Sequence, residues 1–251
     1  KDLRRARGIG FCCICGKPFV NGEKRTRQHV PPRAIFAEED RTPPLILPAH
    51  EKCNGDQSPL DTVIGQLVAV LHRKYPKPDE VKLEVDMFQT AGGGVTAGVK
   101  NLPLRAIIFR WVRYFHAALY GTYLEDKGGM IFEPFPAGDF VDGQLVYAKT
   151  HVSRAHLTHV FKQQLKAGRT DGITCYNGKC QYRCTWLTFD NGTPFCLFAL
   201  RLYNWEELGD PRHPNMGCVG WYFADTPPNA AIGTRLEIAV SNFRPLDPFA
   251  P

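Results

Sequence analysis

Apolar residues recur at helical spacing in two segments of the chain. Ser58 and Pro59, suited to an N-cap and a first helical position, stand before the first segment, and the pattern predicts a helix over 59–74. Its apolar positions are Leu60, Val63, Ile64, Leu67, Val68 and Leu71. The second segment predicts a helix over 104–120. Its apolar face is formed by Ile107, Ile108, Trp111, Val112, Phe115 and Leu119. Three arginines lie off that face, where we expect them to be solvated or to contact the phosphates of a nucleic acid: Arg105, Arg110 and Arg113.

Alternating and turn-bounded segments predict strands elsewhere. Residues 81–88, "VKLEVDMF", alternate like a strand and precede a glycine-rich turn or loop, "TAGGGVTAG". Residues 173–203 contain two Asn-Gly turns between apolar runs, which predicts a three-stranded antiparallel meander extended by "GWYFAD" and "RLEIAVSNF". One helix, "SRAHLTHVFKQQLKAG", precedes this meander.

These elements predict an α+β fold in two parts. Residues 1–75 form a motif-dense N-terminal module. Residues 76–251 form an α+β accessory domain, in which a helical middle leads to a mostly antiparallel β-sheet with a helix. We expect this second part to bind substrate, a protein partner or a second copy of the chain.

Composition narrows the class of protein. The 251 residues, 43% hydrophobic and 22% charged, contain no apolar run of membrane-spanning length and no apolar signal segment, so we expect a cytoplasmic protein without a membrane partner. Nine unevenly spaced cysteines do not form a disulfide framework, and favour metal binding in a reducing compartment. The net charge of +6 suits a phosphate backbone or a solvated basic face. Many of the cations lie early in the chain: Lys1, Arg4, Arg5, Arg7, Lys17, Lys24, Arg25, Arg27 and Arg33.

Two pairs of soft metal ligands occur in the N-terminal module, a C-x-x-C pair and an H-x-x-C pair. The four residues are Cys12, Cys15, His50 and Cys53. Four sulfur and nitrogen donors suit a structural Zn²⁺, which takes tetrahedral ligands and leaves no open position. Gly16 and Pro18 after the first pair are typical of a knuckle turn rather than a core strand. Cys13 is an additional thiol that could replace Cys12, although the C-x-x-C spacing favours Cys12.

Two further groups of residues have simpler explanations than metal binding. The later cysteines could form a second zinc site, but alternation about an Asn-Gly turn explains them as buried sheet residues, which we favour. They are Cys175, Cys180 and Cys184. The clustered histidines have no acidic or cysteine partner nearby and are expected at the surface or facing DNA. They are His151, His156 and His159.

The order of the N-terminal motifs resembles that of the HNH endonuclease family over roughly residues 10–62. The pattern is Cys12-x-x-Cys15, then "HVPP" starting at His29, then "LPAHEKCN" ending at Asn54, and a helix. The resemblance implies a ββα-metal fold with a zinc knuckle, in which a β-hairpin and a helix clasp a metal. It also implies one-metal hydrolysis of phosphodiester bonds in double-stranded DNA, in phage defence or mobile-element biology.

By the same resemblance, His29 is the general base, and Asn54 with Gln28 carries a catalytic Mg²⁺ or Mn²⁺. This assignment is chemically reasonable on its own terms. A neutral histidine accepts a proton from water near pH 7. A hard cation on oxygen ligands stabilises the charge that develops on the phosphate and the leaving oxygen.

Two positions depart from the family pattern. Gln28 offers a neutral amide where the family usually has Asp, Glu or His, which should lower metal affinity. The segment "RTPPLIL" lacks the central Asn that usually organises the loop. Asp56 and Asp61 are nearby carboxylates that could compensate, or could simply complement the helix dipole. A second hypothesis is therefore a catalytically weak or inactive zinc-knuckle module that binds nucleic acid or a protein partner.

Overall fold

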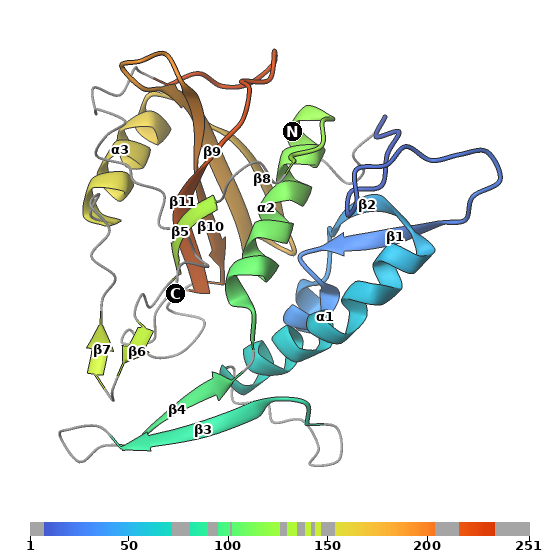
Figure 1. Ribbon diagram of the computed structural model, residues 1–251, viewed down its shortest axis with the longest axis vertical. Coiled ribbons are helices and arrows are strands. Elements are labelled where there is room, and N and C mark those ends of the chain that lie inside the picture. The colour runs from blue at the N-terminus through green and yellow to red at the C-terminus, as the bar shows by residue number, and fades with distance from the viewer. Residues whose placement is uncertain are drawn as a thin grey trace.

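The protein has an α+β fold. The computed structural model describes residues 8–71, 81–89, 95–100, 102–125, 130–134, 139–141, 144–146, 154–203 and 216–233. These ranges contain three α-helices, a five-stranded antiparallel sheet and three two-stranded antiparallel pairs (Figure 1). In chain order, the elements are β1 (Arg25–Val30), η1 (Arg33–Ile35), η2 (Glu38–Asp40), β2 (Leu45–His50), α1 (Glu51–Leu71), β3 (Glu84–Gln89), β4 (Val95–Lys100), α2 (Leu104–Tyr120), β5 (Met130–Pro134), β6 (Asp139–Val141), β7 (Gln144–Val146), α3 (Arg154–Lys166), β8 (Asp171–Cys175), β9 (Cys180–Thr188), β10 (Pro194–Leu202) and β11 (Met216–Phe223).

β1, β2 and α1 follow one another at the N-terminal end of the described chain. β1 pairs antiparallel with β2, and the short 3₁₀ helices η1 and η2 lie in the connection between them. Along β2, Leu45, Leu47 and Ala49 are buried while the alternate residues are only partly covered, so one face of the pair is apolar. α1 packs closely against η1 at Gly65. A Cβ at this position would lie only 2.7 Å from the Cβ of Ala34, so a side chain here would clash.

α1 begins at Glu51, earlier than the apolar pattern predicts. The helix continues directly from β2, which places Cys53 in its first turn. Pro59 lies inside the helix rather than at its start, so the predicted N-cap role of Ser58 is wrong. Residues 51–58 are exposed or only half-buried, and therefore carry no apolar periodicity that would reveal these turns. Residues 72–74 of the predicted helix lie outside the described residues.

β3 confirms the strand predicted in "VKLEVDMF". The glycine-rich segment after it, residues 90–98, is predicted to be a turn or loop, and this is wrong for residues 95–98, because Val95–Lys100 forms β4. β3 and β4 pair from Glu84 opposite Lys100 to Gln89 opposite Val95. Ala97 and Gly98, the small residues of this strand, hide the alternation on which a strand prediction depends.

α2 confirms the second predicted helix, with one correction. It ends at Gly121, whose φ of 70° is left-handed and whose N–H donates to the carbonyl of Ala117 at 2.9 Å. Arg110 was predicted on the solvated side, but it is only 9% exposed. It follows Ile107 by one helical turn and precedes Trp111, so it lies beside the buried stripe rather than opposite it.

The five-stranded sheet contains the predicted meander. Its strand order is β5-β11-β10-β9-β8, in which β8, β9 and β10 are joined as successive hairpins. Tyr176 and Asn177, with φ of 54° and 51°, form the first turn. β11 confirms the predicted "GWYFAD" strand, and β5 extends the sheet beyond it. The predicted strand "RLEIAVSNF" lies outside the described residues, although Ile232 just before it bridges to Trp186.

α2 lies between the sheet and the β1–β2–α1 elements (Figure 1). One cluster of buried apolar residues extends from Val30 through Trp111 and Phe115 to the sheet, where Phe115 stacks on Tyr182 at 4.6 Å between ring centroids. On the other face of the sheet, α3 contributes a second cluster through Val160 and its neighbours. The division into residues 1–75 and 76–251 remains a prediction. None of the described helices combines the length and apolar character that a membrane crossing requires.

Candidate metal centre and the neighbouring strand

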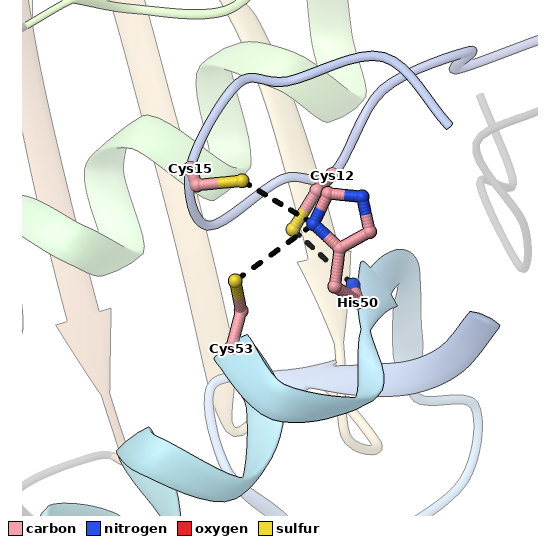
Figure 2. A group of neighbouring side chains, drawn as sticks. All are labelled: Cys12, Cys15, His50 and Cys53. Atoms are coloured by element: carbon pink, nitrogen blue, oxygen red, sulfur yellow. Dashed lines mark hydrogen bonds between the residues drawn. The ribbon is translucent and has the colours of Figure 1, made fainter. Parts of the chain in front are cut away.

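Four potential metal ligands meet where the N-terminal loop, β2 and α1 come together. Their ligand atoms all lie within 4.8 Å of one another, and Figure 2 shows the side chains pointing inward toward a common centre. They are Cys12, Cys15, His50 and Cys53. The structure therefore brings together the two pairs that the sequence spacing singled out.

The first pair lies on a tight turn. The Cys12 N–H donates to the carbonyl of Lys17 and the Gly16 N–H donates to the carbonyl of Cys12, both at 2.9 Å. Gly16 has a φ of 75°, and a Cβ there would lie 2.5 Å from the ring of Tyr123. Glycine is therefore required both by the backbone conformation and by the packed ring. This geometry agrees with the predicted knuckle turn.

The distances suit a tetrahedral ion. The Nδ1 atom of His50 lies 3.4 Å from the sulfur of Cys15 and 3.8 Å from that of Cys53. With Zn–S about 2.3 Å and Zn–N about 2.0–2.1 Å, adjacent sulfur and nitrogen ligands of a tetrahedral zinc lie roughly 3.5 Å apart. The cluster could therefore hold a zinc ion. The thiol of Cys13 is not among the four converging donors. Cys13 is fully buried in the core, and its backbone N–H donates to the carbonyl of Pro48 at 3.0 Å.

The surroundings orient the donors. The Nε2 atom of His50 lies 3.1 Å from the carboxylate of Glu23, so the other ring nitrogen, Nδ1, is left facing the cysteines. The His50 backbone N–H donates to the sulfur of Cys12 at 3.3 Å. Burial, together with the neighbouring thiols of Cys12 and Cys15, raises the pKa of Cys53 to about 12. A dication at the centre would relieve this repulsion between thiolates.

The residues assigned to catalysis lie on β1 and at the start of α1. Gln28 and His29 are consecutive in β1, so their side chains leave opposite faces of the strand. Gln28 is 3% exposed and donates its amide N–H to the carbonyl of His29 at 3.0 Å. His29 and Asn54 are half-buried, and Asn54 follows Cys53 in the first turn of α1. Within the described chain, His29 and Asn54 make no hydrogen bond to each other.

Exposed cations accompany His29. Alternation along β1 puts Arg25 and Arg27 on the same strand face as His29, and Arg33 follows in η1. Burial, with the charges of Arg33 and Arg27, lowers the pKa of His29 below its ordinary value of 6.5. The imidazole is therefore neutral at pH 7 and able to accept a proton, beside groups that attract phosphate.

A buried ion pair joins α1 to α2 on the other side of β1. Arg110 donates to the side-chain oxygens of both Gln57 and Asp61. The amide of Gln28 also hydrogen-bonds Asp61, while the Gln28 Oε1 is buried and has no hydrogen-bond partner. Burial raises the pKa of Asp61, and the hydrogen bonds and charge of Arg110 oppose that rise. Asp61 is thus held by two side chains, Arg110 from α2 and Gln28 from β1.

The loop after His29 is supported from the C-terminal sheet. The hydroxyl of Tyr176 donates to the carbonyl of Pro31 at 2.7 Å, and its backbone N–H donates to Pro43 at 2.8 Å. The Asn177 N–H donates to the carbonyl of Thr42 at 3.0 Å. These bonds hold the loop between β1 and β2 against the turn between β8 and β9.

The remaining cysteines and histidines form no second cluster of converging ligands in the described ranges. The later cysteines are 4% exposed or less and belong to the sheet, in agreement with the favoured prediction. They are Cys175, Cys180 and Cys184. His159 is exposed and hydrogen-bonds Gln163 at 2.8 Å. His151 and the side chain of His156 lie outside the described part of the structure.

Sequence reasoning missed three contributors to this region. Glu23 carries no signal, since it lies in a polar turn far from His50 in the chain. Tyr176 precedes an Asn-Gly hairpin turn, and nothing in the sequence indicates that this turn contacts the loop after His29. Arg110 could have been identified from its place one helical turn after Ile107. No protein-family model, curated protein or solved structure matches the chain.

Proposed function

We propose that the protein is a metal-dependent DNA endonuclease of the HNH type. The observation that carries the proposal is the meeting of the two ligand pairs at the junction of β2 and α1, with His29 on the adjoining strand. Two antiparallel strands followed at once by a helix are also what a ββα-metal fold requires.

In this proposal the four donors hold a structural zinc. All four positions of the tetrahedron are filled by protein, which leaves no site for water or substrate. The ion would tie the knuckle turn to the end of β2 and the start of α1. Asn54 follows a ligand directly and would be held rigidly in place.

His29 acts as the general base. Its imidazole is neutral at pH 7, and one of its ring nitrogens accepts the proton of the attacking water. Arg27 and Arg33 bind the phosphate oxygens and orient the backbone for attack. Asn54 and Gln28 would hold a divalent cation, which when bound stabilises negative charge on the phosphate and on the leaving oxygen.

A second function, nucleic-acid binding without cleavage, has specific support. Gln28 contributes no charge, and Arg110 already neutralises the nearby carboxylate of Asp61. The exposed cations on β1 would still attract a phosphate backbone.

Cleavage of supercoiled plasmid separates the two functions. The zinc-loaded full chain is incubated with Mg²⁺, Mn²⁺ or EDTA, and is compared with His29→Ala and with His159→Ala, a control at an exposed histidine on α3. We expect nicking that needs a divalent cation, falls at least 100-fold in His29→Ala and is unchanged in His159→Ala. If the plasmid stays intact but the protein shifts it on a gel, the binding function is favoured. If the plasmid stays intact and is not shifted, both proposed functions are rejected.

A further inference from the structure

An exposed arginine lies at the end of β1 nearest the candidate metal centre. Arg25 begins the strand and lies directly opposite His50 in the pairing with β2. Its guanidinium lies over the ring of Phe19, 4.6 Å from the ring centroid. The same ring packs edge-on against the imidazole of His50, with the centroids 5.0 Å apart. Phe19 therefore contacts both Arg25 and a donor of the metal centre, and supports the guanidinium at this end of β1.

The carboxylates nearest to Arg25 in the chain and in the strand pairing have other partners. Glu23 lies 3.1 Å from Nε2 of His50, and Glu51 pairs with Lys24. Within the described part of the chain, Arg25 forms no ion pair. Stacking on an aromatic ring uses the flat face of a guanidinium, whereas its N–H donors lie in the plane. These donors are therefore available to an anion.

Arg25 extends the row of groups that the proposed function assigns to phosphate binding and catalysis. Alternation places Arg25, Arg27 and His29 on one face of β1, and both arginines are exposed. Neighbours on one face of a strand lie about 6.7 Å apart. B-DNA carries one phosphate per strand for roughly 3.4 Å of its axis, so this step matches about two phosphates. The row suits a polyanion that runs along β1 from His29 toward the metal centre.

We propose that Arg25 binds a phosphate of a nucleic-acid backbone, and that Phe19 is the positioning residue that holds its guanidinium in place. The inference rests on the proposed function for the identity of the polyanion, and it extends the interface beyond Arg27 to the metal-centre end of β1. Without the ring, the long arginine side chain must be ordered when the phosphate binds, which costs conformational entropy. An arginine that is merely solvated would make nucleic-acid binding depend on neither residue.

Binding of a fluorescent DNA duplex to the zinc-loaded full chain tests the phosphate contact. It is measured at several salt concentrations without Mg²⁺ or Mn²⁺, so that no cleavage occurs. We expect Arg25→Met to make the slope of log K against log salt less negative by about 0.9, and to weaken binding roughly eightfold at about 0.1 M salt. The matched control is Lys24→Met, which removes the neighbouring exposed cation that Glu51 already pairs. It should keep the parent's slope.

A double-mutant cycle tests the positioning role. Phe19→Leu keeps the charge of Arg25 but removes the ring, and should weaken binding roughly two- to fivefold in the parent and not at all in Arg25→Met. Zinc content and circular dichroism are measured for every variant, because Phe19 also packs on His50. Where Phe19→Leu loses zinc, Arg25→Lys replaces it, since an ammonium keeps the charge without the planar, stacked fork. Weaker binding with the parent's slope is then expected.

An unchanged slope in Arg25→Met, or an equal change in Lys24→Met, overturns the phosphate contact. The positioning role is overturned if Phe19→Leu weakens binding equally with and without Arg25, or if Arg25→Lys binds as the parent does. A parent protein that gives the expected binding but leaves plasmid intact rejects the nuclease and keeps the interface. A parent protein that nicks plasmid, while Arg25→Met keeps its slope, rejects this inference alone.

Discussion

His116 provides a pH test of how α2 is attached to the sheet. The residue is 3% exposed, with Nδ1 3.0 Å from the hydroxyl of Tyr222 and Nε2 3.0 Å from the hydroxyl of Thr122. Burial lowers the pKa of His116 to about 4. In the unfolded chain the imidazole returns to its ordinary value of about 6.5.

The difference between these two pKa values determines how the free energy of unfolding changes with pH. The folded state holds the neutral imidazole, whereas the unfolded state binds a proton as the pH falls below 6.5, so the stabilisation is present above pH 6.5 and is lost as the pH falls toward 4. A gap of about 2.5 pKa units is worth about 3 kcal/mol when fully lost. Between pH 7.5 and pH 5, the loss is about 2 kcal/mol of the free energy of unfolding.

Urea unfolding at pH 7.5, 6.0 and 5.0 measures this loss, with His116→Gln as the comparison. The amide of glutamine can donate and accept toward Tyr222 and Thr122, but does not titrate in this range. Carboxylates and the four donors of the candidate metal centre also respond to acid, yet they do so in both proteins. We expect the parent to lose about 2 kcal/mol more than His116→Gln between pH 7.5 and pH 5. Equal losses in the two proteins would refute the reasoning.

Two further predictions concern the support of the site. Tyr176→Phe removes the hydroxyl that donates to the carbonyl of Pro31, and should lower the free energy of unfolding by about 1–3 kcal/mol, because that buried carbonyl loses its partner; an unchanged urea midpoint would contradict this. Gly16→Ala places a methyl group against Tyr123 at a positive φ, and should cost at least about 1–2 kcal/mol and speed loss of zinc to a chelator. Gly10→Ala, which meets nothing within 4 Å, is the matched control, and equal zinc loss from both variants would argue against the predicted effect.

Spacing alone located the four converging donors because the constraint on each pair is local. Two ligands separated by two intervening residues can share an ion whatever the rest of the chain does, so the spacing identifies Cys12 with Cys15 and His50 with Cys53 as pairs. The second helix and the meander were equally accessible, because burial imposes a repeat of 3.6 or 2 on the sequence. The same logic failed for β4, where small residues erase the repeat.

The parts that sequence could not predict depend on contacts between distant segments. Tyr176 supports the loop after His29 only because the turn between β8 and β9 folds against it. Arg110 is buried rather than solvated because Gln57 and Asp61 supply its acceptors. The early start of α1 follows from its direct continuation of β2, not from an apolar pattern.

Zinc content is the most direct test of the metal centre on which the proposed function depends. Elemental analysis of the full chain, purified without added metal or chelator, should give one zinc per chain, and Cys53→Ser should retain much less. Serine replaces the thiolate by a hydroxyl of similar size, so the loss would report the ligand rather than the packing. A parent protein that folds normally with no bound zinc would contradict the account.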